Sequence, residues 1–414
     1  MTEAFSSLFL AALAATLALK LWLGWRHIRH IARHRAEVPA AFRDAIALQQ
    51  HQLAADYCIA KTRFGLFSAV LDCVVILALT FGGVLQWLAV VAAGASASPL
   101  LSGLLLIVGV AVLTGCVSFP LSLYSTFGIE ARFGFNKTTP RLFFIDQIKG
   151  LLLGAVIGLP LVALVLWLMD ISGPLWWLWV WLVWTGFQLL MVALYPTLIA
   201  PLFNKFVALE DLELKARIEA LLQRAGFKSQ GVFVMDGSRR SSHGNAYFTG
   251  FGAGKRIVFF DTLLKQLDHA EIEAVLAHEL GHFKRRHIVK RIALAFALSL
   301  AFLFLLGQLL DAPWFYAGLG VATPSTAMAL ILFFTVAPAF TFPFTPLSSG
   351  LSRRHEYEAD DFAASETDAG KLVSALVKLY RDNASTLTPD PLHSAFYDSH
   401  PPAALRINHL QGNR

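Results

Sequence analysis

The chain has 414 residues, of which 56% are hydrophobic and 15% are charged, and its formal net charge is +6. Because globular proteins are less apolar and about 25% charged, this composition excludes a soluble globular protein and predicts an integral protein of the lipid bilayer. The basic residues cluster beside hydrophobic stretches, where they orient a membrane protein, so the positive charge does not predict binding to nucleic acid.

Seven apolar stretches are each near or above the roughly 18–20 residues that a membrane-spanning helix needs. They cover residues 6–25, 64–93, 99–119, 151–169, 175–203, 288–310 and 326–344. The connections after the first, third and fifth stretches, and the C-terminal tail, are rich in Lys and Arg. The connections 94–98, 170–174 and 311–325 contain neither residue. This alternation predicts seven spans, with the basic side in the cytoplasm and the N-terminus outside.

The spans divide the chain into four predicted segments. Residues 1–203 hold five spans with their cytoplasmic loops, and residues 204–287 form a polar cytoplasmic segment. Residues 288–346 hold the last two spans, and residues 347–414 form a cytoplasmic tail. Asp72 lies within the second span, where a charged side chain faces a bundle interior or a water-filled cavity unless the span boundary is misplaced.

The strongest motif lies in the polar segment, where residues 278–282 read His-Glu-Leu-Gly-His. Apolar residues recur at helical spacing through residues 271–290, so the motif is predicted to lie on a helix. Residues four apart share a helix face, so His278 and His282 can present two imidazoles to one zinc ion. Zinc lowers the pKa of a bound water to about 7, and Glu279 can act on that water as general base. The plain alternative is a solvated, charged helix.

A zinc peptidase needs a third protein ligand. One extension of the motif supplies a downstream histidine after a glycine, but this chain has Arg285 and Ile288 at those two places. The missing ligand is therefore expected to be a glutamate distant in sequence.

The best candidate for that glutamate lies in residues 353–364. Glu356 and Asp360 are four apart and share a predicted helix face, so Glu356 could bind the metal while Asp360 accepts a hydrogen bond from a ligand histidine. His355 and Glu358 are close rivals. A surface helix with charged pairs would give the same pattern.

Residues 245–251 and 256–261 are rich in β-forming residues, and Gly252 and Gly254 lie between them. This pattern predicts a β-hairpin just before the zinc helix. An exposed strand can hold a peptide extended by pairing with its backbone. The alternative is a hairpin that only packs the small cytoplasmic domain.

An ordered series of further motifs runs through most of the chain. It comprises PLSLYSTF (120–127), GFN (134–136), APLFNKF (200–206), DGSRRSSH (236–243), NAY (245–247), KRIVFFDTL (255–263), HELGH (278–282), EYEAD (356–360), SHPP (399–402) and Arg406. With this series the chain resembles the type I CAAX prenyl proteases, which are multi-spanning zinc endopeptidases. The resemblance implies a mainly α fold, a seven-helix transmembrane barrel around a water-filled chamber, with a small cytoplasmic α+β zinc-peptidase domain.

The resemblance also implies the zinc ligands. It implies that His278, His282 and Glu356 bind one zinc ion per chain and that Glu279 is the catalytic base. The chamber would give the carboxylate of Asp72 a wet surface to face.

For substrate binding the resemblance implies two groups of residues. Asn245, with its neighbours Ala246 and Tyr247, would lie on the substrate-binding edge strand. His400 and Arg406 would lie near the reacting carbonyl or the C-terminus of the substrate.

Three hypotheses about function stay open in the sequence. The family's eukaryotic substrates are proteins with a farnesylated cysteine, from which the last three residues are cut. Short external connections and no recognisable endoplasmic-reticulum retrieval signal favour a bacterial inner-membrane version, for which damaged membrane proteins are an alternative substrate. The third hypothesis is a transport protein whose zinc is structural and held by four protein ligands. The oligomeric state is open.

Overall fold

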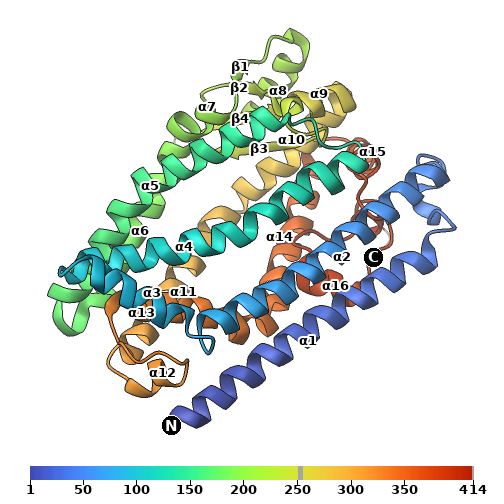
Figure 1. Ribbon diagram of the computed structural model, residues 1–414. Helices are drawn as coiled ribbons and strands as arrows, with labels where there is room; N and C mark the ends of the chain where they lie inside the picture. The colour runs from blue at the N-terminus through green and yellow to red at the C-terminus, as the bar shows by residue number, and fades with distance from the viewer. Residues whose placement is uncertain (250–254, 413–414) are drawn as a thin grey trace.

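The computed structural model describes residues 1–249 and 255–412 of the chain and is mainly helical (Figure 1). Within these residues, seven helical runs are long and apolar enough to cross a membrane, which confirms the predicted number of spans. Their main helices are α1 (Thr2–His34), α2 (Leu48–Leu79), α4 (Pro99–Leu123), α5 (Pro140–Ile171), α6 (Trp176–Leu194), α11 (His287–Leu309) and α13 (Thr326–Thr341).

The predicted extent of the second span, residues 64–93, is wrong. Helix α2 ends at Leu79, and a separate, shorter helix α3 (Val84–Ala95) follows it. Two glycines make the break. Gly83 has the left-handed φ of +75°, and a Cβ on Gly82 would lie 2.6 Å from the carbonyl oxygen of Ala78. A helix cannot continue through a left-handed residue, so α2 ends here and α3 starts in a new direction.

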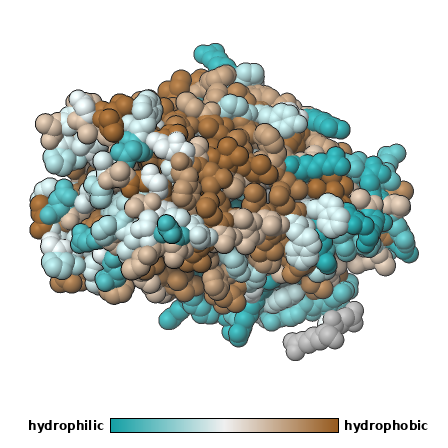
Figure 2. All heavy atoms as spheres, turned by 60° about the horizontal axis from the view of Figure 1, so that its bottom comes forward, coloured by the Kyte–Doolittle hydropathy of each residue, from teal (hydrophilic) through white to brown (hydrophobic). Residues whose placement is uncertain are grey.

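Several of the membrane helices bury only a small part of their surface against the rest of the protein. Only 6% of the most apolar stretch is buried in each of the runs that contain α2, α5 and α6. In a close-packed bundle each helix buries one full face, so these helices have a lipid face outside and a second uncovered face inside. Figure 1 shows the long helices running in similar directions, and Figure 2 shows apolar side chains over much of the face seen there.

A four-stranded sheet lies at the end of the molecule opposite the N-terminus (Figure 1). Its strands are β1 (Phe206–Ala208), β2 (Val232–Met235), β3 (Ala246–Thr249) and β4 (Arg256–Phe260), in the order β1-β2-β4-β3. Strands β3 and β4 pair antiparallel, as the hairpin prediction requires. The turn with Gly252 and Gly254 lies outside the described residues. Among the described strands β3 is an edge strand, so one side of its backbone is free.

Further helices pack on this sheet and on one another, and together with the sheet they form the second domain of the protein. They are α8 (Leu212–Arg224), α9 (Asp261–Gln266), α10 (His269–Lys284), α14 (Thr345–Glu366), α15 (Ala369–Asp382), α16 (Pro391–Tyr397) and α17 (Ala403–Leu410). Their core includes Ile218, Phe259, Leu276 and Ala363, all buried. Helix α14 continues the run of α13 through a short 3₁₀ turn, Phe342–Phe344, so the seventh span leads directly into this domain.

One buried carboxylate fastens α15 to the start of α10. Asp268 caps α10 by accepting from the Glu271 backbone N–H, and Glu271 accepts from the Asp268 N–H, both at 2.8 Å. The Glu271 carboxylate also accepts from Ser374 Oγ at 2.6 Å and from Lys378 Nζ at 2.7 Å. Burial raises the pKa of Glu271, but the hydrogen bonds from Lys378 and Ser374 outweigh burial and lower it below its ordinary value.

Replacing Glu271 with glutamine is expected to destabilise the domain by about 1–3 kcal/mol at neutral pH, because the Lys378 ammonium loses its anionic partner. A lowered folded-state pKa gives stability that is present above the unfolded-state value near 4.3 and is lost as pH falls through the folded-state pKa. The difference in Tm between wild type and E271Q should therefore stay constant from pH 7 to about 5 and narrow as the pH falls below about 4.3. As a control, K371Q breaks only the exposed pair with Asp268 and should change Tm little. A difference in Tm between wild type and E271Q that does not depend on pH would contradict this explanation.

Candidate active site

Two helices meet at a glycine to build the site. Gly281 of α10 faces Ala359 of α14, and a Cβ on Gly281 would lie 2.8 Å from the Ala359 Cα. The missing side chain lets the two backbones touch. The helix face with His278 and His282 then lies directly against Glu356, one turn before Ala359 on α14.

The ligand atoms of His278, His282 and Glu356 lie within 4.8 Å of one another. Their closest approaches are 3.3 Å between the two Nε2 atoms, 3.3 Å from His278 Nε2 to Glu356 Oε2, and 3.4 Å from His282 Nε2 to Glu356 Oε1. Ligands about 2.0–2.1 Å from a tetrahedral zinc ion lie about 3.3–3.4 Å from each other. The three side chains therefore match the spacing of a zinc site.

The hydrogen bonding of the same atoms also fits a cation. The buried Oε2 of Glu356 has no donor in hydrogen-bond geometry among the described residues. An unpaired buried carboxylate oxygen is costly, and a metal ion removes that cost. Two imidazoles and one carboxylate are a typical donor set for a catalytic zinc ion, which keeps its fourth position open.

Asp360 and Arg406 contact His278 at Nδ1, the ring nitrogen that does not face Glu356. Asp360 Oδ1 lies 2.7 Å from His278 Nδ1, and Asp360 also accepts from Arg406 Nε at 2.8 Å and from Nη2 at 2.5 Å. With Nδ1–H donating to Asp360, Nε2 of His278 faces Glu356 and would bind a metal ion on losing its proton. Burial lowers the pKa of His278, but hydrogen bonds to Asp360 and Glu356 outweigh it and raise the pKa to about 9.

A second chain of hydrogen bonds, which the sequence did not predict, holds His282. Arg286 has a left-handed φ of 58°, which ends α10 and turns the chain into α11. This turn brings His287 Nδ1 to 3.0 Å from His282 Nδ1, and His287 Nε2 to 3.0 Å from Glu358 Oε2. If His287 donates from Nε2 to the carboxylate, its Nδ1 accepts from His282. The lone pair of His282 is then on Nε2.

Removing this support is expected to weaken zinc binding about 10–100-fold in H287A. Competition against a chelator of known affinity measures this directly. H355A is the matched control, because His355 stacks on His287 with ring centroids 4.0 Å apart but makes no link in the chain to His282. H287N restores an acceptor near the Nδ1 position and should recover part of the affinity. Equal zinc affinity in H287A and H355A would show that His287 contributes only by packing, and not through its hydrogen bond to His282.

Glu279 lies beside the ligands in a groove with a volume of about 580 Å³, which His282, Glu356 and His400 also line. Burial raises the pKa of Glu279 above its ordinary value, and the nearby imidazoles of His278 and His282 oppose this shift. A carboxylate with a raised pKa is a better proton acceptor near neutral pH. The position and the environment of Glu279 thus suit a general base.

Of the predicted substrate residues Asn245, Ala246 and Tyr247, only Tyr247 is among the residues that line this groove. Tyr247 and Phe248 of β3 line it. Asn245 precedes the strand with an exposed side chain, and Ala246 packs its side chain toward the domain core. Only the backbone of Ala246 can therefore meet a peptide, whereas Tyr247 can contact one through its side chain.

His400 and Arg406 lie in different surroundings. His400 is exposed in the groove, with Nε2 3.5 Å from Glu356 Oε1 and Nδ1 3.0 Å from Ser399 Oγ. Arg406 is only 5% exposed, and its guanidinium is held by Asp360. The geometry thus leaves His400 free to meet a substrate and commits Arg406 to positioning the ligands.

From the ligand cluster the groove extends between α11 and α14. There its lining includes the aliphatic side chains Ile288, Leu294, Ala295, Leu298 and Leu351, together with the polar Arg291, Ser348 and Ser352. These residues lie on helical runs that are long and apolar enough to cross a membrane. The groove therefore joins the histidines and carboxylates to a mainly aliphatic part on α11 and α14.

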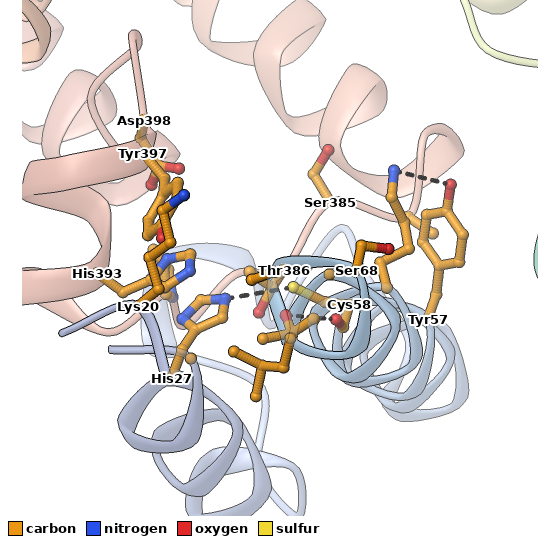
Figure 3. A pocket seen from close by; sticks show the side chains of 18 of the residues that line it. Lys20, His27, Tyr57, Cys58, Ser68, Ser385, Thr386, His393, Tyr397 and Asp398 are labelled. Carbon is orange, nitrogen blue, oxygen red and sulfur yellow. Dashed lines mark hydrogen bonds between the residues drawn. The ribbon is translucent and has the colours of Figure 1, made fainter. Parts of the chain in front are cut away.

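A second, larger pocket of about 690 Å³ lies between α1, α2 and residues 383–398, and it includes Asp72. Figure 3 shows its side chains, with His27 and Cys58 pointing toward one another at 3.4 Å. Tyr397 and Asp398 line this pocket, whereas Ser399 and His400 line the groove, so one loop separates the two spaces. Asp72 thus faces a cavity, as the sequence suggested.

Comparison with known proteins divides the chain into two parts, one with the first five membrane helices and one with the candidate site. Residues 27–205 match the family described as CAAX prenyl protease N-terminal, five membrane helices, and residues 208–414 match Peptidase family M48. A CAAX prenyl protease 1 homolog of Arabidopsis thaliana is 41% identical over 311 residues, which are 73% of this chain and 72% of that protein. The chain belongs to the CAAX prenyl protease family of M48 metallopeptidases.

Other members of this family match almost the whole chain. The CAAX prenyl protease 1 homolog of Caenorhabditis elegans is 31% identical over 97% of both proteins. The crystal structure of S. mikatae Ste24p superposes with a TM-score of 0.90 at 32% identity and covers 98% of both chains. The fold predicted from the sequence, a seven-helix membrane barrel around a chamber with a small peptidase domain, is confirmed. The protein is an integral, multi-pass membrane metallopeptidase.

Proposed function

We propose that this protein is a zinc endopeptidase that cleaves peptide bonds near the C-terminus of prenylated proteins. The observation that carries the proposal is the groove that joins the His278, His282 and Glu356 cluster to aliphatic side chains of α11 and α14. A peptide cut at the cluster could leave a lipid chain against these aliphatic side chains, where burial of each CH₂ contributes about 0.8 kcal/mol.

His278, His282 and Glu356 would hold the zinc ion in this mechanism. A bound zinc ion supplies a Lewis acid and makes hydroxide available near neutral pH. Glu279 accepts the proton of the attacking water on a carboxylate oxygen and passes it to the leaving amine nitrogen. Ser399 donates its hydroxyl to His400 Nδ1, so His400 Nε2–H is free to donate to the oxyanion.

Strand β3 is the proposed docking edge for the substrate backbone. Its free side, at Asn245, Ala246 and Tyr247, can pair with an extended peptide, which then lies along the groove toward Glu279. The N–H and C=O groups of the strand fix the peptide, and the Tyr247 side chain lines the groove. Asp360 and Arg406 contribute by fixing His278, without contacting the substrate.

We also propose that the catalytic side faces the cytoplasm. The basic connections and the peptidase domain lie on the same side of the seven spans, and the positive-inside rule places that side in the cytoplasm. The short external connections are our reason to propose the inner membrane of a bacterium as the location.

The test is cleavage of a farnesylated CAAX peptide by the purified protein in detergent, beside the same peptide without the lipid. We expect loss of the last three residues and a clear preference for the lipid-bearing peptide. Cleavage of neither peptide by protein that retains one zinc ion would overturn the prenyl-protease proposal. A misfolded membrane protein would then be the substrate to test, as the quality-control hypothesis requires.

A further inference from the structure

The polar end of α1 carries one continuous face of tryptophans and arginines. Trp22, Arg26, Arg29 and Arg33 are spaced by three or four residues and share this face, and Trp25 borders it. The Arg26 guanidinium lies 6.0 Å from the Trp22 ring, and the Arg29 guanidinium lies 4.5 Å from the Trp25 ring. The aromatic rings therefore hold two of the arginines in place.

This face is hollowed where it meets the C-terminal part of the chain. A pocket of about 180 Å³ lies between α1 and the residue before α16, Asp390. It is too small for a drug-sized ligand, and its side-chain donors all come from α1. Its lining is Trp25, Arg26, Arg29, His30, Arg33 and Asp390.

The charges in the pocket do not cancel. Asp390 is 1% exposed, and it accepts from Arg26 Nε at 2.9 Å and from the backbone N–H groups of Leu392 and His393. Asp390 thus neutralises Arg26. Arg29 and Arg33 are exposed, and neither has a carboxylate within 4.0 Å among the described residues. Two guanidinium groups therefore remain to bind an anion.

We propose that this pocket binds the phosphate of an anionic membrane lipid. Helix α1 crosses the membrane, and Trp22 and Trp25, which are 46% and 51% exposed, lie next to the arginines. Half-exposed tryptophans beside basic residues mark the headgroup level of a bilayer. A guanidinium fork donates two parallel hydrogen bonds to phosphate oxygens, and the tryptophan faces pack against the glycerol and upper acyl chains.

The bound lipid would lie beside the Arg26–Asp390 ion pair, which joins two distant parts of the chain. Asp390 caps α16, and residues 383–398 line the large pocket behind the catalytic groove. The proposal does not rest on the protease function, because it concerns only the C-terminal, basic end of α1 and its contact with Asp390.

The test is native mass spectrometry of the full-length protein in detergent. The probe is a short-chain phosphatidylglycerol, beside the matching phosphatidylcholine and inorganic phosphate. Because each arginine near an anionic surface contributes about 1 kcal/mol, R29Q/R33Q should weaken phosphatidylglycerol binding about 30-fold. K215Q/K228Q removes the same charge from the peptidase domain and should bind like wild type. If the double variant does not insert, R33Q alone should weaken binding about fivefold.

Preferential binding of phosphatidylglycerol that is lost in the arginine variant would support the proposal. Binding that is equal in R29Q/R33Q and wild type would overturn it. Inorganic phosphate that competes as well as the lipid would also overturn it, because the site would then recognise a free anion and not a headgroup.

Discussion

Replacement of Glu279 by glutamine is expected to lower kcat for peptide cleavage by about 10³–10⁴-fold while one zinc ion stays bound. The amide keeps the size of the side chain but cannot accept the proton of the attacking water, and general base catalysis contributes up to about 10⁴-fold. The ligands His278, His282 and Glu356 are untouched, so zinc content and Tm should match wild type. Steady-state kinetics on a cleaved peptide, with metal analysis of the same sample, checks both parts.

E273Q is the matched control for this experiment. Glu273 lies on the same helix and pairs with Arg217 and Arg224 outside the groove. The same chemical change there should leave kcat within about twofold of wild type, as expected for a change remote from the reacting atoms. Full activity in E279Q would remove Glu279 from the mechanism, and equal losses in both variants would point to a general effect on the domain.

Replacement of Gly281 by valine is expected to abolish activity for a different reason. A Cβ at this position would lie 2.8 Å from the Cα and 3.0 Å from the carbonyl oxygen of Ala359. Backbone atoms cannot move aside as a side chain can, so α14 must shift away from α10 and take Glu356 with it. We expect at least about a 100-fold loss of activity, because a displacement near 1 Å can cost that much, and a domain less stable by about 1–3 kcal/mol.

The matched control for G281V is G154V. Gly154 lies within α5, where an added Cβ would meet nothing within 4 Å. The G154V variant reports how much stability is lost when a β-branched residue replaces a helical glycine. We expect no change in its zinc affinity. Zinc affinity in G281V that equals wild type would show that the helix contact does not set the position of Glu356.

The features that sequence could predict are those with a local signal. Length and hydropathy give the seven spans, and helical spacing places His278 and His282 on one face. The sequence did not predict the break between α2 and α3, because glycines such as Gly82 and Gly83 are common in membrane helices. Only the left-handed φ of Gly83 ends the helix. Hydropathy has no access to a backbone angle.

The rest of the candidate site depends on contacts between segments distant in sequence. Spacing alone left Glu356, Glu358 and His355 as rivals, because all three lie on one short stretch of α14. The contact at Gly281 separates them, since it turns Glu356 toward the histidines of α10. His287 lies one residue before the place where the local metal-binding extension has its histidine, so that motif gives it no role. Its contact with His282 arises from the left-handed turn at Arg286, which no periodicity reports.

The central claim is a zinc ion held by two histidines and one glutamate with a fourth position open. X-ray absorption at the zinc edge, on purified protein with one equivalent of zinc, tests it most directly. The account predicts two imidazole nitrogens and one carboxylate oxygen from the protein, a fourth light ligand that exchanges with solvent, and loss of the carboxylate signal in E356A. Four protein ligands with no exchangeable position would contradict the account and indicate a structural metal.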